Sequence, residues 1–137
     1  MNYSDNVQIV RQLYIAYGQG DVESMLTLLT ENVEWHFVGH SQDIPYAGHY
    51  QGQEAVATLF ALLTDTCELH LFGPLQIMAS GSHVVVLGHE RVRVRPTDRF
   101  FETEWAHWFT LKDGKIERWQ EFHDTATIAA AFRPVIS

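Results

Sequence analysis

The spacing of apolar residues changes along the chain, from steps of three and four in the first half to alternation in the second. Steps of three and four place side chains on one face of a helix, whereas alternation places them on one face of a strand. The pattern therefore predicts three helices before residue 67, with a short strand over residues 33–38 and a loop over 39–48 between the second and the third. The helical stripes are Val7, Val10, Leu13, Tyr14 and Tyr17, then Val22, Met25, Leu26, Leu28 and Leu29, then Val56, Leu59, Phe60 and Leu63.

The alternating half predicts strands over residues 67–79, 83–95, 101–111 and 116–124, followed by a short helix over 125–132. Gly73-Pro74 interrupts the first of these strands, and because proline cannot donate to a ladder it marks an edge or a bulge. Helices followed by an antiparallel meander indicate an α+β fold, with three N-terminal helices packed on a curved, mostly antiparallel sheet.

The last two strands form a hairpin around Asp113-Gly114, a dipeptide that tolerates positive φ and is typical of tight turns. The first strand of the hairpin carries one face of Phe101, Thr103, Trp105, His107, Phe109 and Leu111. A two-residue turn would pair Trp105 with Phe122, whereas a glycine bulge would bring Trp119 beside His107. The sequence leaves open which face of the last strand points inward.

Composition restricts the partners of the protein. A length of 137 residues predicts one domain, residues 1–137, with a real hydrophobic core. The net charge is −8, and the run of arginines at 91, 93, 95 and 99 lies among acids, so we expect a salt-bridged strand surface and no nucleic-acid binding. A single Cys67 and the absence of a recognisable signal sequence favour a reducing, cytoplasmic location. No run of about 18 apolar residues suggests a membrane span.

Four segments hold most of the distinctive residues: YIAYGQGD, ENVEW, PYAGHYQGQEAVATLF and EWAHWFTLKDGKIERWQEFHDT. Together they resemble the NTF2-like superfamily, and most closely its SnoaL-like branch of polyketide cyclases and ketosteroid-isomerase relatives. The resemblance covers nearly the whole chain. It implies a cone-shaped pocket with its mouth near the C-terminal end and a homodimer through the outer sheet face. It also implies general acid–base chemistry on a carbonyl, enol or epoxide, without a metal or an organic cofactor.

The resemblance points to three catalytic candidates. Asp124 matches the aspartate that SnoaL-like cyclases use as acid–base catalyst, and an apolar cone would raise its pKa. The same aspartate precedes Thr125 and could instead cap a helix. His107 resembles the position that donates a hydrogen bond to the developing oxyanion. His36 falls within one residue of the catalytic aspartate of the isomerases, where a histidine could still abstract a proton.

Aromatic residues supply most of the expected pocket wall. Tyr14 or Tyr17 resembles the isomerase tyrosine of the oxyanion site. Arg91 resembles the arginine of related epoxide hydrolases, but Arg93 stands where those enzymes have an aspartate, which argues against their mechanism. Glu90 is the nearest acid and could equally be a salt-bridged surface residue. The predicted substrate-binding residues are Tyr14, Tyr17, Trp35, Tyr46, Arg91, Trp105, Phe109, Trp119 and Phe122.

Eight histidines raise the question of a metal site. His36 and His40 lie in a strand and a loop rather than on one helix, so no metal is expected. The expected partner is a small hydrophobic molecule, bound by an enzyme of the cyclase, isomerase or dehydratase type. The fold also permits a non-catalytic binding module or an interaction domain. Trp108 and Trp119 lie on strands that already have one helix-covered face, and they predict a homodimer.

Overall fold

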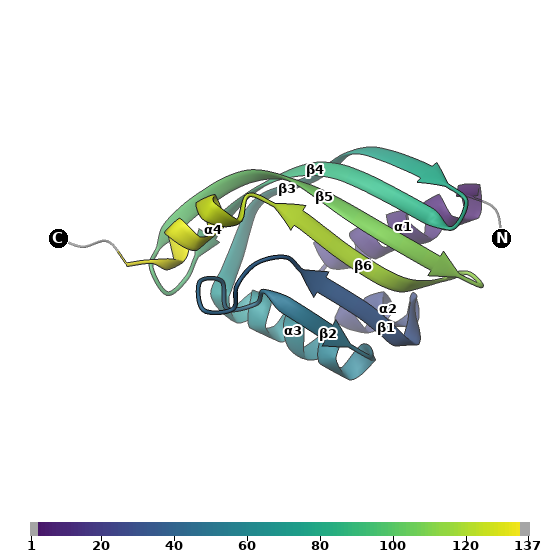
Figure 1. Ribbon diagram of the computed structural model, residues 1–137, viewed down its shortest axis with the longest axis horizontal. Coiled ribbons are helices and arrows are strands. Elements are labelled where there is room, and N and C mark those ends of the chain that lie inside the picture. Colours follow the sequence, from purple (N-terminus) through teal and green to yellow (C-terminus); the bar gives the residue numbers. More distant parts are fainter. Residues whose placement is uncertain (1–2, 135–137) are drawn as a thin grey trace.

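In the computed structural model, which describes residues 3–134, six strands form one curved sheet and three helices cover its concave side (Figure 1). A fourth helix follows the last strand and packs on β5 (Figure 1). The helices are α1 (Tyr3–Gly18), α2 (Val22–Thr27), α3 (Gln53–Thr66) and α4 (Thr125–Phe132). The strands are β1 (Leu29–Phe37), β2 (Gly48–Gln51), β3 (Cys67–Ser80), β4 (His83–Val94), β5 (Arg99–Lys112) and β6 (Lys115–His123).

The predicted α+β fold is confirmed, with differences at the second helix and at β2. Asp21 caps α2 as expected, since its carboxylate accepts from the Ser24 amide at 3.1 Å, but this helix ends at Thr27. Leu29 instead begins β1 and pairs with Ile116 of β6, because a sheet partner is available there. Strand β2 was predicted as loop and helix start, and its four residues are too few for alternation to identify.

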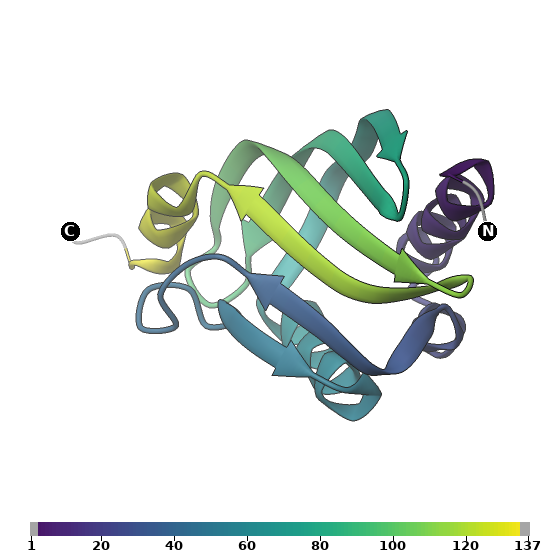
Figure 2. The same cartoon turned by 45° about the vertical axis from the view of Figure 1, so that its right-hand side comes forward.

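The strand order is β2-β1-β6-β5-β4-β3, and β1 lies parallel to β6 while the other neighbouring strands are antiparallel. Figure 2 shows how this arrangement brings β1, in blue, beside β6, in yellow-green. Strand β1, from the first half of the chain, therefore lies beside the last strand in the interior of the sheet. At the opposite edge, β3 is irregular between Pro74 and Gln76, as its proline predicted.

The β5–β6 hairpin combines the two alternatives that the sequence left open. Asp113 (φ 50°) and Gly114 (φ 81°) form a two-residue turn, and Leu111 pairs with Ile116. The register then shifts by one residue, so that His107 lies opposite Glu121. Because side chains alternate along a strand, this bulge decides which half of β6 faces the helices.

The bulge turns Trp119 inward and Phe122 outward. Trp119 is 3% exposed, whereas Phe122 is 44% exposed on the convex face. Trp119 therefore faces the helices, on the side expected of a substrate-binding residue, and not the uncovered convex face. Trp108 lies on the convex face, at 36% exposure, and Leu87 on the neighbouring strand β4 is 38% exposed.

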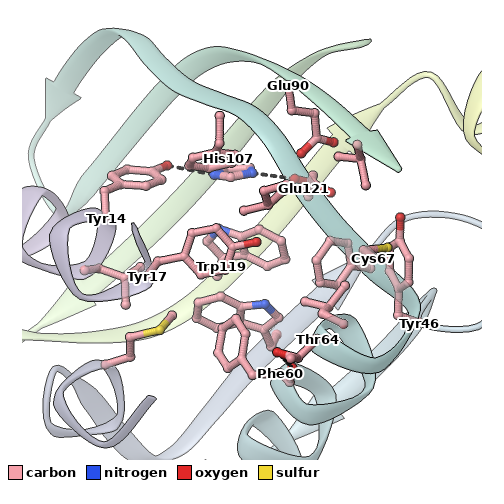
Figure 3. A pocket seen from close by; sticks show the side chains of 18 of the residues that line it. Tyr14, Tyr17, Tyr46, Phe60, Thr64, Cys67, Glu90, His107, Trp119 and Glu121 are labelled. Atoms are coloured by element: carbon pink, nitrogen blue, oxygen red, sulfur yellow. Dashed lines mark hydrogen bonds and ion pairs between the residues drawn. The ribbon is translucent and has the colours of Figure 1, made fainter. Parts of the chain in front are cut away.

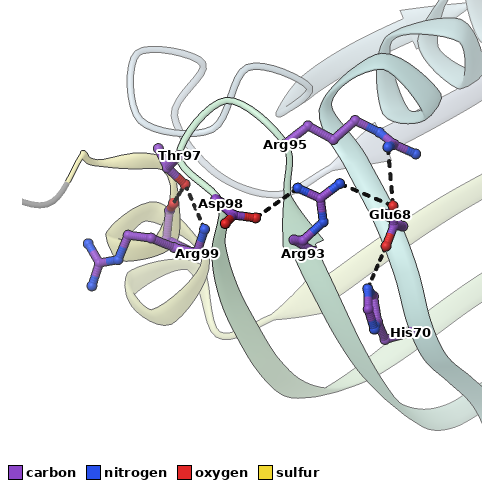
Figure 4. Close-up of polar contacts among 8 residues, drawn as sticks. Glu68, His70, Arg93, Arg95, Thr97, Asp98 and Arg99 are labelled. Carbon is purple, nitrogen blue, oxygen red and sulfur yellow. Dashed lines mark hydrogen bonds and ion pairs between the residues drawn. The ribbon is translucent and has the colours of Figure 1, made fainter.

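Arg93 of β4 and Arg95, just after that strand, form ion pairs with neighbouring acids (Figure 4). Arg93 contacts Glu68 at 3.1 Å and Asp98 at 2.9 Å, and Arg95 contacts Glu68 at 3.3 Å. Hydrogen bonds from Arg93 and His70 lower the pKa of the Glu68 carboxyl to about 2. The acids therefore pair with two of the four arginines of the basic run, whereas Arg99 donates to the Ala130 carbonyl. No helix within residues 3–134 is long and apolar enough to cross a bilayer.

Candidate functional site

A cavity of about 180 Å³ lies between the concave face of the sheet and helices α1, α2 and α3. Apolar cavities of about 150 Å³ admit benzene, so this one has room for at least an aromatic ring. Its walls are largely aromatic and aliphatic. The predicted pocket residues that line it are Tyr14, Tyr17, Trp35, Tyr46, His107 and Trp119.

The cavity reaches solvent between the α1–α2 connection and the α3–β3 junction. Among its lining residues, Gly20, Thr64 and Leu69 are exposed. The family resemblance placed the mouth near the C-terminal end, but there Tyr46 packs edge-on against Phe132, with ring centroids 5.8 Å apart. A ligand would therefore enter beside the helices rather than beside α4.

A chain of polar contacts runs from the cavity into the sheet (Figure 3). The Tyr14 hydroxyl of α1 lies 2.7 Å from Nδ1 of His107 on β5. His107 Nε2 lies 2.5 Å from Oε2 of Glu121 on β6. The other carboxylate oxygen of Glu121 lies 2.6 Å from His123 Nδ1, and His123 Nε2 donates to the Val38 carbonyl at 2.8 Å.

Burial and charge give the members of this chain different protonation states. Burial raises the pKa of Tyr14 above its usual value, so its hydroxyl stays neutral. Burial also lowers the pKa of His107, and Glu121 offsets this only in part. Burial opposes ionisation of Glu121, but His107 and His123 outweigh it and lower the pKa of this carboxyl to about 2. Glu121 is thus a carboxylate held between two imidazoles.

Glu90 of β4 is a second buried carboxyl group on the same wall, 8% exposed. Its side chain lines the cavity and points toward Glu121 (Figure 3). No residue within the described range 3–134 forms a hydrogen bond with it. Burial, and then the negative charge of Glu121, raise the pKa of Glu90 well above its usual value. Burial therefore favours the protonated form of Glu90, whose hydroxyl can donate a hydrogen bond to a ligand.

The sequence reasoning did not select Glu90 or Glu121 as site residues. A signal existed for Glu90, because alternation placed this acid on the same strand face as Val84, Val86 and Val92, all of which are buried. No comparable signal existed for Glu121, since only the register shift in the hairpin turns it inward.

Trp105 supports His107 from outside the cavity lining. The two rings stack with centroids 3.8 Å apart and planes 14° from parallel. Gly88 lies opposite Trp105 on β4, and a Cβ atom there would approach the indole Cζ2 to 2.1 Å. The absence of a side chain at Gly88 therefore makes room for the indole that backs His107.

The remaining predicted residues do not line the cavity. Phe109 is fully buried in the core and meets Tyr14 edge-on at 5.9 Å. Arg91 lies over the Phe100 ring at 4.0 Å, and Phe100 is 42% exposed. Phe122 is exposed on the convex face, as described above.

His36 and Asp124 also lie away from the cavity. His36 stacks on His49 of β2, with ring centroids 3.7 Å apart, on the strand face opposite Trp35. Asp124 is exposed and caps α4, because its carboxylate accepts from the Thr127 amide at 3.1 Å and from the Thr127 hydroxyl at 2.7 Å. These hydrogen bonds lower the pKa of Asp124. Within residues 3–134 no three His, Cys, Asp or Glu side chains are grouped as a metal ion would require.

The fold is an α+β cone that encloses an aromatic cavity, and buried polar side chains form part of its wall. Such a cavity is typical of proteins that bind small ligands. The chain belongs to the SnoaL-like domain family, whose model matches residues 10–119. It is similar to an NTF2-like protein from Burkholderia xenovorans LB400, with 32% identity over 97% of this chain and 99% of that chain and a TM-score of 0.89. An NTF2-like protein from Burkholderia thailandensis E264 has 26% identity over 93% of this chain and 96% of that chain, with a TM-score of 0.84. No curated protein sequence matches the chain significantly.

Proposed function

We propose that the protein is an enzyme that moves protons on a small, uncharged, hydrophobic carbonyl compound. The observation that carries this proposal is the pair of carboxyl groups in one cavity, with the pKa of Glu90 raised and that of Glu121 lowered. Two titratable groups whose environments separate their pKa values in this way are suited to act as acid and base in one reaction.

The lining of the cavity supports an uncharged substrate. Within the described residues, neither Lys nor Arg lines the cavity, so a carboxylate or phosphate would find no cationic partner. An anion would also meet the ionised Glu121 in a medium of low dielectric constant. The protonated Glu90 is complementary to a carbonyl oxygen, which accepts a hydrogen bond.

Proton abstraction would start at Tyr14. The substrate C–H proton moves to the Tyr14 oxygen while the hydroxyl proton of Tyr14 moves to Nδ1 of His107, 2.7 Å away. The electron pair of the C–H bond remains on the substrate as an enolate. The imidazolium formed at His107 is stabilised by Glu121 on its other nitrogen, so Tyr14 never carries a full negative charge.

Glu90 would complete the step from the oxygen end of the substrate. As the enolate forms, the Glu90 proton moves to the carbonyl oxygen, and the product is an enol beside a Glu90 carboxylate. In a substrate with a β,γ double bond the enol is a dienol, and return of the His107 proton through Tyr14 to the γ-carbon, with the enol O–H proton returning to Glu90, would give isomerisation. Attack of the enol carbon on a second carbonyl group of the same molecule would give cyclisation, with the enol O–H proton returning to Glu90 and the His107 proton passing through Tyr14 to the new alkoxide.

In this proposal His107 keeps the acid–base role expected from the sequence, and Tyr14 joins it. We assign Asp124 to helix capping, because both of its carboxylate oxygens are occupied at the start of α4. We assign no chemical role to His36, which stacks on His49 outside the cavity.

A non-catalytic binding module for a small apolar ligand is the second candidate. It is favoured by the fact that both ring nitrogens of His107 already have partners, Tyr14 and Glu121. In that case Glu90 would serve as a single polar anchor for the ligand, and no proton would be transferred.

Proton exchange in D₂O distinguishes the two candidates without knowledge of the natural substrate. The protein would be incubated with 2-indanone, 2-tetralone and a Δ5-3-ketosteroid, and deuterium at the α-carbon would be followed by mass spectrometry. If the protein is an enzyme of this kind, at least one ketone should exchange faster than in buffer alone. Binding seen by NMR with exchange at the buffer rate for all three would favour the binding module.

The variant Asp124→Asn tests the capping assignment. Asparagine caps helices about as well as aspartate, so the melting temperature should stay close to that of the parent protein. If Asp124 only caps α4, the exchange rate should also be unchanged, whereas loss of an acid–base catalyst would lower it by roughly 10²–10⁴-fold. Asp124→Ala is the matched control, and it should lower the melting temperature because it removes the cap.

We also propose a homodimer through the convex face of the sheet. Trp108 and Phe122 are 36% and 44% exposed there, and covering such side chains is favourable. Sedimentation at micromolar concentration should give twice the 15.7 kDa mass of one chain, and Trp108→Glu should shift the protein to the monomer. A parent protein that sediments at the mass of one chain would contradict the proposal.

A further inference from the structure

We infer that His123 is a positioning residue that keeps His107 in the tautomer that accepts a proton from Tyr14. The chemical role of His123 rests on the proposed function. The contacts that support this role are those of His123, which does not itself line the cavity. His123 follows Glu121 by two residues on β6, and 1% of its side chain is exposed. It joins Glu121 to the backbone at the end of β1.

The Val38 carbonyl determines which groups donate and which accept along the chain of contacts. A carbonyl oxygen can only accept, so His123 Nε2, at 2.8 Å, carries a proton. His123 Nδ1 lies 2.6 Å from Oε1 of Glu121, although it does not form a well-aligned hydrogen bond. An unprotonated nitrogen would repel a carboxylate oxygen at that separation. Both ring nitrogens of His123 are therefore protonated, and the ring is a buried cation.

The consequence passes through Glu121 to His107. With His123 beside it, Glu121 stays ionised and accepts from His107 at its other oxygen. His107 therefore carries its proton on Nε2, and the lone pair of Nδ1 points at the Tyr14 hydroxyl. The tautomer of His107, the proton acceptor, is thus determined by the Val38 carbonyl, which acts through His123 and Glu121.

His123 also adjusts the basicity of His107. The positive charge of His123 lowers the pKa of His107, while Glu121 raises it. The other titratable groups around the chain are Glu90 on β4, Tyr14 and Tyr17 on α1, Tyr46 in the β1–β2 loop and Asp124 after β6. None of these is a cation. Removal of the His123 charge would leave only burial to oppose Glu121, which raises the pKa of His107.

The test is a ¹⁵N NMR titration of the histidine rings, which needs no substrate. In the parent protein at pH 7, both ring nitrogens of His123 should be protonated, and His107 should be protonated at Nε2 only. In His123→Gln, which keeps a polar side chain without the charge, the pKa of His107 should rise by at least about one unit. The matched control is His40→Gln, in an exposed loop position, which should leave the titration of His107 unchanged.

Two results would overturn the inference. One is a parent His123 with a single protonated ring nitrogen at pH 7, which can be measured even if His123→Gln does not fold. The other is a His107 titration in His123→Gln that matches that of His40→Gln, as expected if His123 only fills space. Failure of the proposed function would appear differently, as absence of ketone exchange while both NMR results hold.

Discussion

Glu90→Gln should lower the rate of ketone α-proton exchange by roughly 10²–10⁴-fold, the usual contribution of a general acid. Glutamine preserves the size of the side chain and its ability to donate a hydrogen bond, but it cannot transfer a proton to the carbonyl oxygen. The measurement is the exchange rate by mass spectrometry with the most reactive of the three ketones. Glu104→Gln on the exposed face of β5 is the matched control and should exchange at the parent rate.

The pH dependence provides a second measurement on the same variant. The pKa of Glu90 is raised in the folded protein, so the parent should lose exchange activity as the pH rises through that value. The exchange rate of Glu90→Gln should not fall in this way at high pH. If the variant exchanges at the parent rate and its rate still falls at high pH, Glu90 is not the acid.

Stability separates this effect from misfolding. A carboxyl group whose folded pKa is raised contributes stability below its unfolded pKa of about 4.3, and this contribution is lost as the pH rises through the folded pKa. Near neutral pH the buried Glu90 therefore opposes folding, and Glu90→Gln should melt no lower than the parent protein. A large decrease in melting temperature would instead identify Glu90 as a structural residue.

Gly88→Ala should destabilise the protein by about 1–3 kcal/mol, the usual cost of overpacking a dense core. The added methyl group would lie 2.1 Å from the Trp105 ring, so the indole has to move. Because Trp105 stacks on His107, the exchange rate should fall as well. Thermal unfolding and the ketone assay measure the two effects.

Gly73→Ala is the matched control for this variant. Gly73 lies on the neighbouring strand β3 and pairs with His89, but an added Cβ there would meet no atom within 4 Å. It should unfold close to the parent protein. Equal stability of the two alanine variants would show that the Trp105 ring does not need the space at Gly88.

The candidate site joins the N-terminal helix to three consecutive strands from the second half of the chain. Tyr14 comes from α1, Glu90 from β4, His107 from β5 and Glu121 from β6. Their chemistry depends on contact with one another, since the fold as such supports many functions. The exchange assay and the histidine titration test the cavity and the chain of contacts separately.

The sequence by itself determined the fold class and the inward faces of β4 and β5. Alternation along these strands is strict, and the residues that it assigned to one face, from Val84 to Val94 and from Phe101 to Leu111, are buried. It also identified α4 within its observed bounds and placed Tyr14, Trp35 and His107 at the pocket. The strand faces and α4 follow from local periodicity, which a side-chain pattern records directly, whereas the pocket residues followed from the family resemblance.

Only the tertiary structure decided the inward face of β6 and the protonation of the two carboxyl groups. One extra residue after the hairpin turn exchanges the two faces of a strand, and this shift brings Glu121 rather than Phe122 to His107. The raised pKa of Glu90 depends on burial and on the charge of Glu121, two strands away in the sheet. The alternation along one strand does not show which of two registers the hairpin adopts, and burial is a property of the folded chain, so the sequence pattern left both features open.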